Sequence, residues 1–353
     1  MLKQESKILL RPLIFWEGFP ACGLLLKKVA DELGEDLVVV ATKPAVPFLG
    51  LEEELGHKII WLNEPNEIWS RRDEFSDRNF VLHTGWGHGD WLKFDRFLKK
   101  KNNVKIVLVS DNRFRNDFRQ WLGAIYFRFF LRRYFDGAFT PGISGKKLLA
   151  FLGMPKDHIY SPNYGAYEGI FKSTRQINER RNEFLFVGQL IKRKSIDLVI
   201  QAFKEYKLEG GRWSLRISGD GPLAALCEGG AIFLEGFLQP NEVAERMNNA
   251  KAFIFPSRDD NWGTALCEAA ACGMLLVSAK STGASFDILT DEENGYLLEK
   301  ITKEDIKRAM FRIERMSNEE LASGSAESIR VAGRFDSGAY YEAFKKMQND
   351  LCD

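Results

Sequence analysis

The sequence predicts an α/β protein made of two doubly wound, Rossmann-like domains that face a central cleft. Three observations support this fold class. The 353-residue chain is too long for one ordinary domain and about right for two. Short aliphatic and β-branched runs alternate with longer helical patterns, as in βαβ units. Most of these runs are continuous rather than alternating, which is typical of parallel strands that helices cover on both faces.

Five strands are expected in each half of the chain. The expected strands span residues 7–15, 36–42, 58–62, 79–82 and 104–110 in the first half, and 183–187, 213–218, 232–234, 252–255 and 274–278 in the second. Between the halves, the polar stretch 173–182 lacks apolar periodicity and predicts a linker. A first domain of residues 1–172 and a second of residues 183–335 follow from this division. Doubly wound sheets bind ligands beyond the carboxyl ends of their strands, so we expect a site in the cleft between them.

Composition excludes several classes of protein. The formal net charge is +1, from 50 basic and 49 acidic residues, which argues against a nucleic-acid binder that works by neutralising phosphates. The five cysteines are scattered and form no CxxC pair, and no signal-peptide apolar region is seen. No apolar run reaches the roughly 18 residues that a membrane-spanning helix needs. We therefore expect a cytoplasmic protein with reduced thiols, and contact with a membrane surface stays open.

The strongest candidate for a ligand site is the segment 256–273. A buried strand ends before it, an acidic loop follows, and a helix of small residues begins near Gly263. The free amides and positive dipole end of such a helix suit an anion such as a diphosphate. Asp260 precedes the helix and Glu268 lies about one turn inside it, where carboxylates can accept hydrogen bonds from sugar or ribose hydroxyls. The alternative is an N-capping acid and a solvated helical glutamate.

Three other loops follow strands in the second half. In 184–195 a strand leads to the basic residues 192–194 and to a helix that Ser195 is expected to cap. A lysine at the mouth of such a loop suits a phosphate group, although a solvated basic turn is the alternative. The turn 219–222 contains two glycines that permit close backbone approach, and its proline suits the start of a helix. A further strand ends at 236–238, where backbone amides can meet a nucleotide base.

The order and spacing of these elements resemble the retaining GT-B glycosyltransferases of family 4, the group 1 glycosyltransferases. The resemblance runs with gaps from Phe184 to about Glu299, and includes the segments 281–284 and 294–297. It is weaker in the first half, at 141–153 and 163–171. It implies a GT-B fold whose terminal helix, 336–353, crosses back to the first domain.

The resemblance implies transfer of a sugar, with retention, from a UDP- or GDP-sugar to a hydroxyl of a glycan or lipid-linked glycan. Synthesis of a cell-envelope polysaccharide or lipopolysaccharide at the inner face of the membrane is the expected setting. No cluster of His, Cys or Asp has metal-ligand spacing, so no metal or other cofactor is expected to be required.

The resemblance also assigns roles to individual residues. Asp260 is expected to hold donor-sugar hydroxyls, Glu268 the nucleotide ribose, and Lys194 the donor diphosphate. The sequence departs from the family pattern where Asp260 replaces a glutamate, with Asp259 as a competitor, and where Gln189 replaces an arginine and Ser195 a glycine. The expected donor-binding residues are Gln189, Arg193, Lys194, Gly219, Gly236, Phe237, Asp260, Trp262, Gly263, Thr264 and Glu268, and the expected catalytic residues are Lys194, Asp260 and His83.

In the first domain, the loop after the first strand corresponds to the family's glycine loop across the cleft. Its glycines, Gly18 and Gly23, are well separated rather than adjacent. His83 closes a strand and resembles the family's cleft histidine near the transferred sugar, although a structural histidine is the alternative. His88 and Asp111 are weaker candidates in the same region.

The segment 114–135 combines arginines with many aromatic and aliphatic residues. It is expected to form a helix that is buried on one face, with arginines extending on the other. Either it packs into the first domain, or it is an interfacial helix that meets a lipid-linked or membrane-embedded acceptor.

Two rival functions stay open. A GT-B epimerase or phosphorylase fits the Lys194 and Asp260/Glu268 pattern less well. A catalytically silent scaffold that keeps this fold and serves as partner subunit of another transferase is the alternative from a different class, because Asp260 and Gln189 depart from the family pattern.

Overall fold

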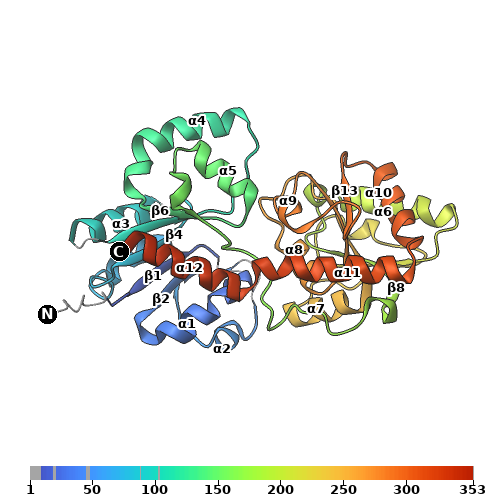
Figure 1. The fold of residues 1–353 in the computed structure, drawn as a ribbon, viewed down its shortest axis with the longest axis horizontal. Coiled ribbons are helices and arrows are strands. Elements are labelled where there is room, and N and C mark those ends of the chain that lie inside the picture. Colours follow the sequence, from blue (N-terminus) through green and yellow to red (C-terminus); the bar gives the residue numbers. More distant parts are fainter. Residues whose placement is uncertain (1–8, 19–20, 45–47, 88, 102–103, 353) are drawn as a thin grey trace.

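The computed structural model describes residues 9–18, 21–44, 48–87, 89–101 and 104–352, and it contains two parallel sheets (Figure 1). The first sheet has the strand order β3-β2-β1-β4-β5-β6-β7 and the second β10-β9-β8-β11-β12-β13. The strands of the first sheet are β1 (Pro12–Trp16), β2 (Val38–Thr42), β3 (Ile59–Leu62), β4 (Phe80–Thr84), β5 (Lys105–Val109), β6 (Gly137–Phe139) and β7 (Ile159–Tyr160). Those of the second are β8 (Arg181–Val187), β9 (Ser214–Ser218), β10 (Ile232–Leu234), β11 (Ala250–Phe255), β12 (Leu275–Ala279) and β13 (Gly295–Leu298).

These sheets confirm the predicted fold class of two Rossmann-like domains. Each of the ten expected strands corresponds to an observed one, although β1 begins at Pro12, later than expected. The strands β6, β7 and β13, with three, two and four residues, were not predicted. Strand order reverses beside β1 and β4 in one sheet and beside β8 and β11 in the other, and ligands bind at such reversals.

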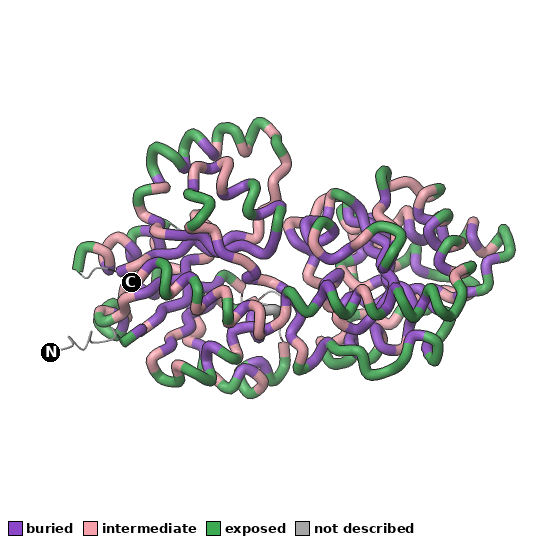
Figure 2. Tube along the Cα trace, in the orientation of Figure 1, coloured by how far each residue is buried: buried purple, intermediate pink, exposed green. Residues whose placement is uncertain are grey.

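Helices cover both faces of each sheet. Figure 2 shows the strands as buried and the helices as exposed along their outer sides. The first-domain helices are α1 (Lys27–Leu33), α2 (Leu51–Leu55), α3 (Gly89–Lys101), α4 (Phe118–Tyr126) and α5 (Ile143–Phe151). They are followed by α6 (Ile196–Leu208), α7 (Pro240–Asn249), α8 (Thr264–Ala271), α9 (Ser285–Ile288), α10 (Lys303–Glu314), α11 (Asn318–Ala332) and α12 (Ser337–Cys352).

The last helix, α12, lies against the first domain although it follows the second in the chain (Figure 1). Its Lys345 ammonium is 2.9 Å from the Glu32 carboxylate of α1. The ring of Tyr340 packs against Phe139 of the first sheet, with centroids 5.1 Å apart. Just before α12, the Phe335 ring lies against Trp262 of the second domain, with centroids 5.4 Å apart.

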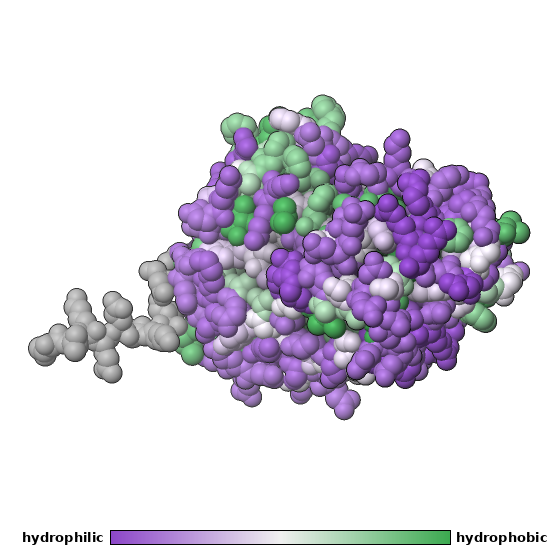
Figure 3. Space-filling view, turned by 45° about the vertical axis from the view of Figure 1, so that its right-hand side comes forward, coloured by the Kyte–Doolittle hydropathy of each residue, from purple (hydrophilic) through white to green (hydrophobic). Residues whose placement is uncertain are grey.

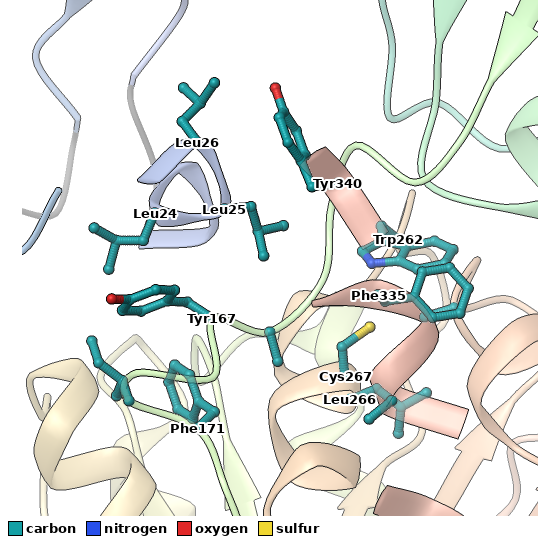
Figure 4. Close-up of a cluster of buried hydrophobic side chains, with 14 of the residues drawn as sticks. Leu24, Leu25, Leu26, Tyr167, Phe171, Trp262, Leu266, Cys267, Phe335 and Tyr340 are labelled. Carbon is teal, nitrogen blue, oxygen red and sulfur yellow. The ribbon is translucent and has the colours of Figure 1, made fainter. Parts of the chain in front are cut away.

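A hydrophobic cluster therefore continues from one domain into the other (Figure 4). It brings together side chains from the segment before α1, from the segment after β7, from α8 and from the start of α12. Its labelled members are Leu24, Leu25, Leu26, Tyr167, Phe171, Trp262, Leu266, Cys267, Phe335 and Tyr340. Because apolar burial is the main driving force of packing, this cluster fixes the base of the cleft between the domains.

The polar stretch 173–182 is held to the second domain. The buried Arg180 guanidinium donates hydrogen bonds to the backbone oxygens of Arg175, Met247 and Cys272. The strand β8 already begins at Arg181. These hydrogen bonds of Arg180 anchor the stretch 173–182 to the second domain, although its sequence has no apolar periodicity.

Candidate functional site

The loop after β11 carries Asp260 to the carboxyl edge of the second sheet. The backbone of Asp260 is fixed on both sides, since its amide donates to the Ser281 oxygen at 3.0 Å and its oxygen accepts from the Gly283 amide at 3.1 Å. The helix α8 then begins after Gly263, which has φ of 88°. A Cβ atom at Gly263 would lie 2.6 Å from the Thr282 methyl group, so a side chain there would disturb the loop.

The loop after β8 is joined to this acidic loop by its backbone. The Arg258 amide donates to the Arg193 oxygen at 2.8 Å, and the Arg193 guanidinium donates to the Asp259 oxygen at 2.7 Å. These bonds place Lys194 and Asp260 side by side as a direct ion pair. Only 12% of the lysine side chain and 14% of the aspartate side chain are exposed.

The ion pair determines the charge at the centre of the site. Burial lowers the pKa of Lys194, and the Asp260 carboxylate opposes that shift. The Lys194 ammonium also lies 4.8 Å from the centre of the Phe255 ring. A second cation, the Arg193 guanidinium, lies 3.8 Å from the Asp260 carboxylate. The arrangement keeps two positive groups beside one carboxylate at the start of α8.

Ser195 does not cap α6 in the way the sequence predicts. It occupies the position before the helix, but its side chain makes no capping hydrogen bond and its hydroxyl is buried without a partner. Its backbone has φ of 59°, in the left-handed region that favours glycine. The serine thus adopts a conformation that glycine adopts without steric cost.

Replacing Ser195 with glycine should therefore stabilise the protein by about 1 kcal/mol, because it removes both the left-handed strain and a buried hydroxyl without a partner. Urea unfolding measures the change. The Ser195→Ala variant is the matched control, since it removes the hydroxyl and keeps the strained side chain. A glycine variant less stable than the wild type would contradict this account.

Three glycines bring the ends of neighbouring strands into backbone contact. A Cβ atom at Gly219 would lie 1.9 Å from the Gly188 oxygen, and the Gly219 amide donates to the Gly236 oxygen at 2.7 Å. Phe237 follows with an exposed ring. The helix expected after Pro222 is wrong, because only a short 3-10 turn, Ala224–Leu226, forms before a pair of glycines.

The cleft at these loops has a volume of about 630 Å³, within the usual range for ligand sites. Both domains line it. From the first domain come Asp111, Arg115 and Tyr164. From the second come Val187, Gly188, Gln189, Arg193, Lys194, Phe255, Asp259, Asp260, Asn261, Trp262, Gly263, Thr264 and Ala265. The cleft thus brings together Gln189, Arg193, Lys194, Asp260, Trp262, Gly263 and Thr264 of the predicted set.

Glu268 lies one turn inside α8 and is not among the residues that line this volume. As a residue it keeps some contact with solvent, yet in the described part of the chain no donor or cation pairs with its carboxyl group. Burial without compensation therefore raises the pKa of Glu268 to about 7. Such an acid is placed to accept hydrogen bonds that the protein itself does not supply.

Asp259, the expected competitor of Asp260, is engaged by the first domain. Its carboxylate is 3.1 Å from the Arg113 guanidinium and 3.0 Å from that of Arg115. Burial opposes ionisation, but the two arginines outweigh it and hold the pKa of Asp259 below its ordinary value. Arg115 also donates to Asn261 at 2.7 Å.

Neither Arg113 nor Arg115 was predicted from the sequence as a site residue. They follow β5, so the rule that places sites beyond strand ends points to them as well as to Asp111. The Asp111 carboxyl lines the cleft; burial raises its pKa, opposed in part by a hydrogen bond with Asn261.

The structure does not bring His83 to the cleft. Its imidazole is fully buried at the end of β4, 2.6 Å from the equally buried Asp95 carboxylate of α3. The rings of Phe15, Trp91 and Phe135 pack around it, and the centroid of each lies 6.1 Å from the centroid of the His83 ring. These surroundings support the structural alternative for His83.

The glycine loop of the first domain is described only in part. Gly18 donates its amide to the Thr42 hydroxyl at 2.8 Å, and Gly23 is buried in the 3-10 turn Ala21–Leu26. Neither lines the cleft. Residues 19–20 of this loop and the candidate His88 lie outside the described residues.

Within the described ranges, no group of three or more His, Cys, Asp or Glu is arranged to hold a metal ion. Metal-independent chemistry stays a prediction. In the same ranges, no helix has the length and apolar character needed to cross a bilayer.

The second domain matches a known family. Residues 170–328 match the family model of Glycosyl transferases group 1. The matched segment is a little under half of the chain. An uncharacterised glycosyltransferase of Methanocaldococcus jannaschii is 26% identical over 229 residues, which cover 63% of this chain and 58% of the relative. CapM of Staphylococcus aureus, a capsular polysaccharide biosynthesis glycosyltransferase, is 28% identical over 176 residues, or 46% of this chain and 45% of CapM. The chain spans about half the length of these relatives.

Solved structures match the whole fold. HepE of Anabaena, in complex with UDP and glucose, has a TM-score of 0.77 and 13% identity, and the match covers 97% of this chain and 100% of HepE. The lipopolysaccharide outer core galactosyltransferase WaaB has a TM-score of 0.67 and 14% identity, over 96% of this chain and 99% of WaaB. At such identities the likeness shows the fold alone. The two sheets thus form a GT-B fold, and the family match supports a GT-B protein of glycosyltransferase group 1.

Proposed function

We propose that the chain is a retaining glycosyltransferase of family 4 that moves a sugar from a nucleotide-diphosphate sugar to an acceptor hydroxyl. The observation that carries this proposal is the Lys194–Asp260 pair at the start of α8, inside a cleft that both domains line. A buried cation beside a helix N-terminus suits a diphosphate leaving group, whose negative charge grows as the bond to the sugar breaks.

The donor is proposed to lie across the loops of the second domain. Lys194, Arg193 and the first amides of α8 bind the diphosphate. Asp260 accepts hydrogen bonds from sugar hydroxyls, and Glu268 accepts them from the ribose. The strand ends at Gly219, Gly236 and Phe237 then provide the surface for the base.

Arg115 supports this placement because it adds a positive charge to the cleft. Gln189 stands where the family commonly has an arginine, so the second domain alone has one cation fewer. The Arg115 guanidinium reaches the same cleft from the first domain and is paired there with Asp259. A diphosphate can compete with that carboxylate for the guanidinium.

In the proposed reaction, the bond between the anomeric carbon and the diphosphate oxygen breaks while the acceptor oxygen attacks from the same face. The acceptor proton passes to the departing phosphate oxygen. Preorganised cations stabilise the diphosphate without reorganisation, and exclusion of water limits hydrolysis of the donor. The reaction is proposed to need no metal.

The comparisons support particular substrates. HepE binds UDP and UDP-glucose, and the pneumococcal transferase GtfA binds UDP and GlcNAc, which makes a UDP-sugar the first donor to test and a GDP-sugar the second. CapM and WaaB take part in capsular polysaccharide and lipopolysaccharide synthesis by their names. They support a glycan or lipid-linked glycan of the cell envelope as the acceptor. We propose that transfer takes place at the inner face of the membrane.

Calorimetric titration of the intact protein with UDP, GDP, UDP-glucose and GDP-mannose tests the proposal. We expect one nucleotide to bind with a defined stoichiometry and to raise the melting temperature through linkage. If the protein binds none of these nucleotides or nucleotide sugars, the proposal that it is a glycosyltransferase is wrong, and the catalytically silent scaffold is favoured.

A further inference from the structure

The helix α4 and the turns that follow it expose a continuous apolar surface at the outer edge of the first domain. Three small or apolar side chains, Ala124, Phe127 and Leu131, face the protein and are buried. The residues on the opposite side are large, apolar and between 52% and 75% exposed. They are Phe118, Trp121, Leu122, Ile125, Tyr126, Phe129 and Phe130, and we call them the α4 surface.

One stripe of this segment packs into the first domain and the other faces out, so the segment has the packed face of the first alternative, and the interfacial role of the second stays a prediction. Exposed apolar patches of this kind mark interaction sites. Figure 3 shows hydrophobic side chains gathered at the top of the molecule, where Figure 1 places α4. The surface is the convex side of a helix rather than a groove, so it suits a broad, deformable surface more than a docked peptide.

The charges beside the α4 surface are positive. Arg119, Arg128 and Arg133 are exposed, and at about 100° per residue Arg119 and Arg128 fall on opposite borders of the apolar stripe. The single acid of the segment 114–135, Asp117, accepts the Gln120 amide at 2.9 Å as the N-cap of α4. A stripe of Trp, Tyr, Phe and Leu bordered by arginines complements a bilayer with anionic headgroups.

A second cavity lies beside α4 and shares lining residues with the candidate site. Its volume is about 420 Å³, and its lining includes Arg119 and Gly123 of α4. Arg115 and Asp259, which also line the donor cleft, form its other end. The Arg115–Asp259 ion pair therefore lies between the cavity beside the exposed helix and the cleft.

We propose that the α4 surface docks the protein on an anionic phospholipid membrane. The apolar side chains enter the boundary between headgroups and acyl chains, and the arginines contact lipid phosphates. The further consequence, which rests on the proposed function, is that the cavity beside α4 admits the polar end of a lipid-linked acceptor toward Asp259 and Arg115.

Co-sedimentation with vesicles of phosphatidylcholine and phosphatidylglycerol tests the docking. The triple variant Trp121→Ser, Ile125→Ser, Phe129→Ser should lose about tenfold or more in vesicle affinity, since each exposed side chain contributes apolar burial in the membrane. The control is Leu208→Ser, which removes an apolar side chain that is 87% exposed in the second domain and should leave binding unchanged. The affinity of the wild type for these vesicles should fall when salt is added, and it should be lower for vesicles of phosphatidylcholine alone.

Equal binding of the triple variant and the wild type would overturn the proposal, as would equal affinity for vesicles with and without phosphatidylglycerol. A wild-type dimer that the triple substitution dissociates, without any vesicle binding, would assign the surface to a second copy of the chain instead. Nucleotide titration of the triple variant separates this inference from the proposed function. The α4 surface does not include the donor residues, so nucleotide affinity should stay at the wild-type value whichever way the vesicle assay ends.

Discussion

Replacing Lys194 with alanine should lower turnover of the donor sugar by about a hundredfold to a thousandfold, the usual effect of removing one preorganised charge from a transition-state site. The substitution removes the cation that the structure places at the start of α8. Among the described residues, it also leaves Arg193, 3.8 Å away, as the one remaining ion-pair partner of the Asp260 carboxylate. Release of the free nucleotide from the preferred donor measures the effect.

Loss of a buried ion-pair partner also costs stability, so a second variant is needed. Lys194→Met keeps an unbranched apolar side chain at this position and removes the charged group that lies 4.8 Å from the centre of the Phe255 ring. It should lose turnover as Lys194→Ala does, with a melting temperature that shows the protein is folded. Lys192→Ala is the matched control, because that side chain belongs to the same turn and is exposed. Near-normal turnover in a folded Lys194→Met protein would remove Lys194 from the reaction.

The sequence predicts the fold well because strand periodicity and chain order are local properties. Continuous apolar runs mark ten of the thirteen strands that the structure describes, and the loops after two of them contain Lys194 and Asp260. Both loops follow strands beside the reversal of strand order, so the rule for doubly wound sheets places them together. The local pattern around Gly263 likewise predicts where α8 begins.

Contacts between distant segments could not be predicted in the same way. The pairing of Asp259 with Arg113 and Arg115 joins loops of different domains, and no periodicity encodes it. His83 stands at a strand end, as a cleft residue would, but packing against α3 buries it. In 114–135 the difficulty is different, because apolar residues occupy two opposite stripes and the pattern alone does not say which one faces the protein.

The Glu268→Gln substitution should have two opposite effects, a more stable protein and weaker binding of the nucleotide. Burial raises the pKa of Glu268 from 4.5 to about 7, so its ionised form is disfavoured in the folded state. The buried Cys272 thiol nearby stays neutral, because burial raises its pKa to about 12. At about 1.4 kcal/mol per pKa unit, and allowing for burial of the amide, the glutamine variant should be about 1–3 kcal/mol more stable at pH 8.

The pH dependence of this gain has a definite sign. Between pH 4.5 and about 7 the folded protein binds more protons at Glu268 than the unfolded chain, so this residue lowers stability as the pH rises through that window. The advantage of Glu268→Gln should therefore be small at pH 5 and full at pH 8. Thermal unfolding of both proteins at the two pH values measures it.

Nucleotide binding should change in the other direction. Ribose hydroxyls donate hydrogen bonds to the ionised carboxylate, so binding favours deprotonation and wild-type affinity should rise as the pH passes through about 7. The glutamine variant should bind more weakly at pH 8 and lose this part of the pH dependence, while titration of the nucleotide's own phosphate stays in both proteins. A structural glutamate would give the stability change without the loss of affinity. A variant that is more stable and binds the nucleotide as well as the wild type would thus remove Glu268 from the donor site. A variant that is more stable but binds the nucleotide more weakly would show that Glu268 is kept in an unfavourable environment because it binds the ribose.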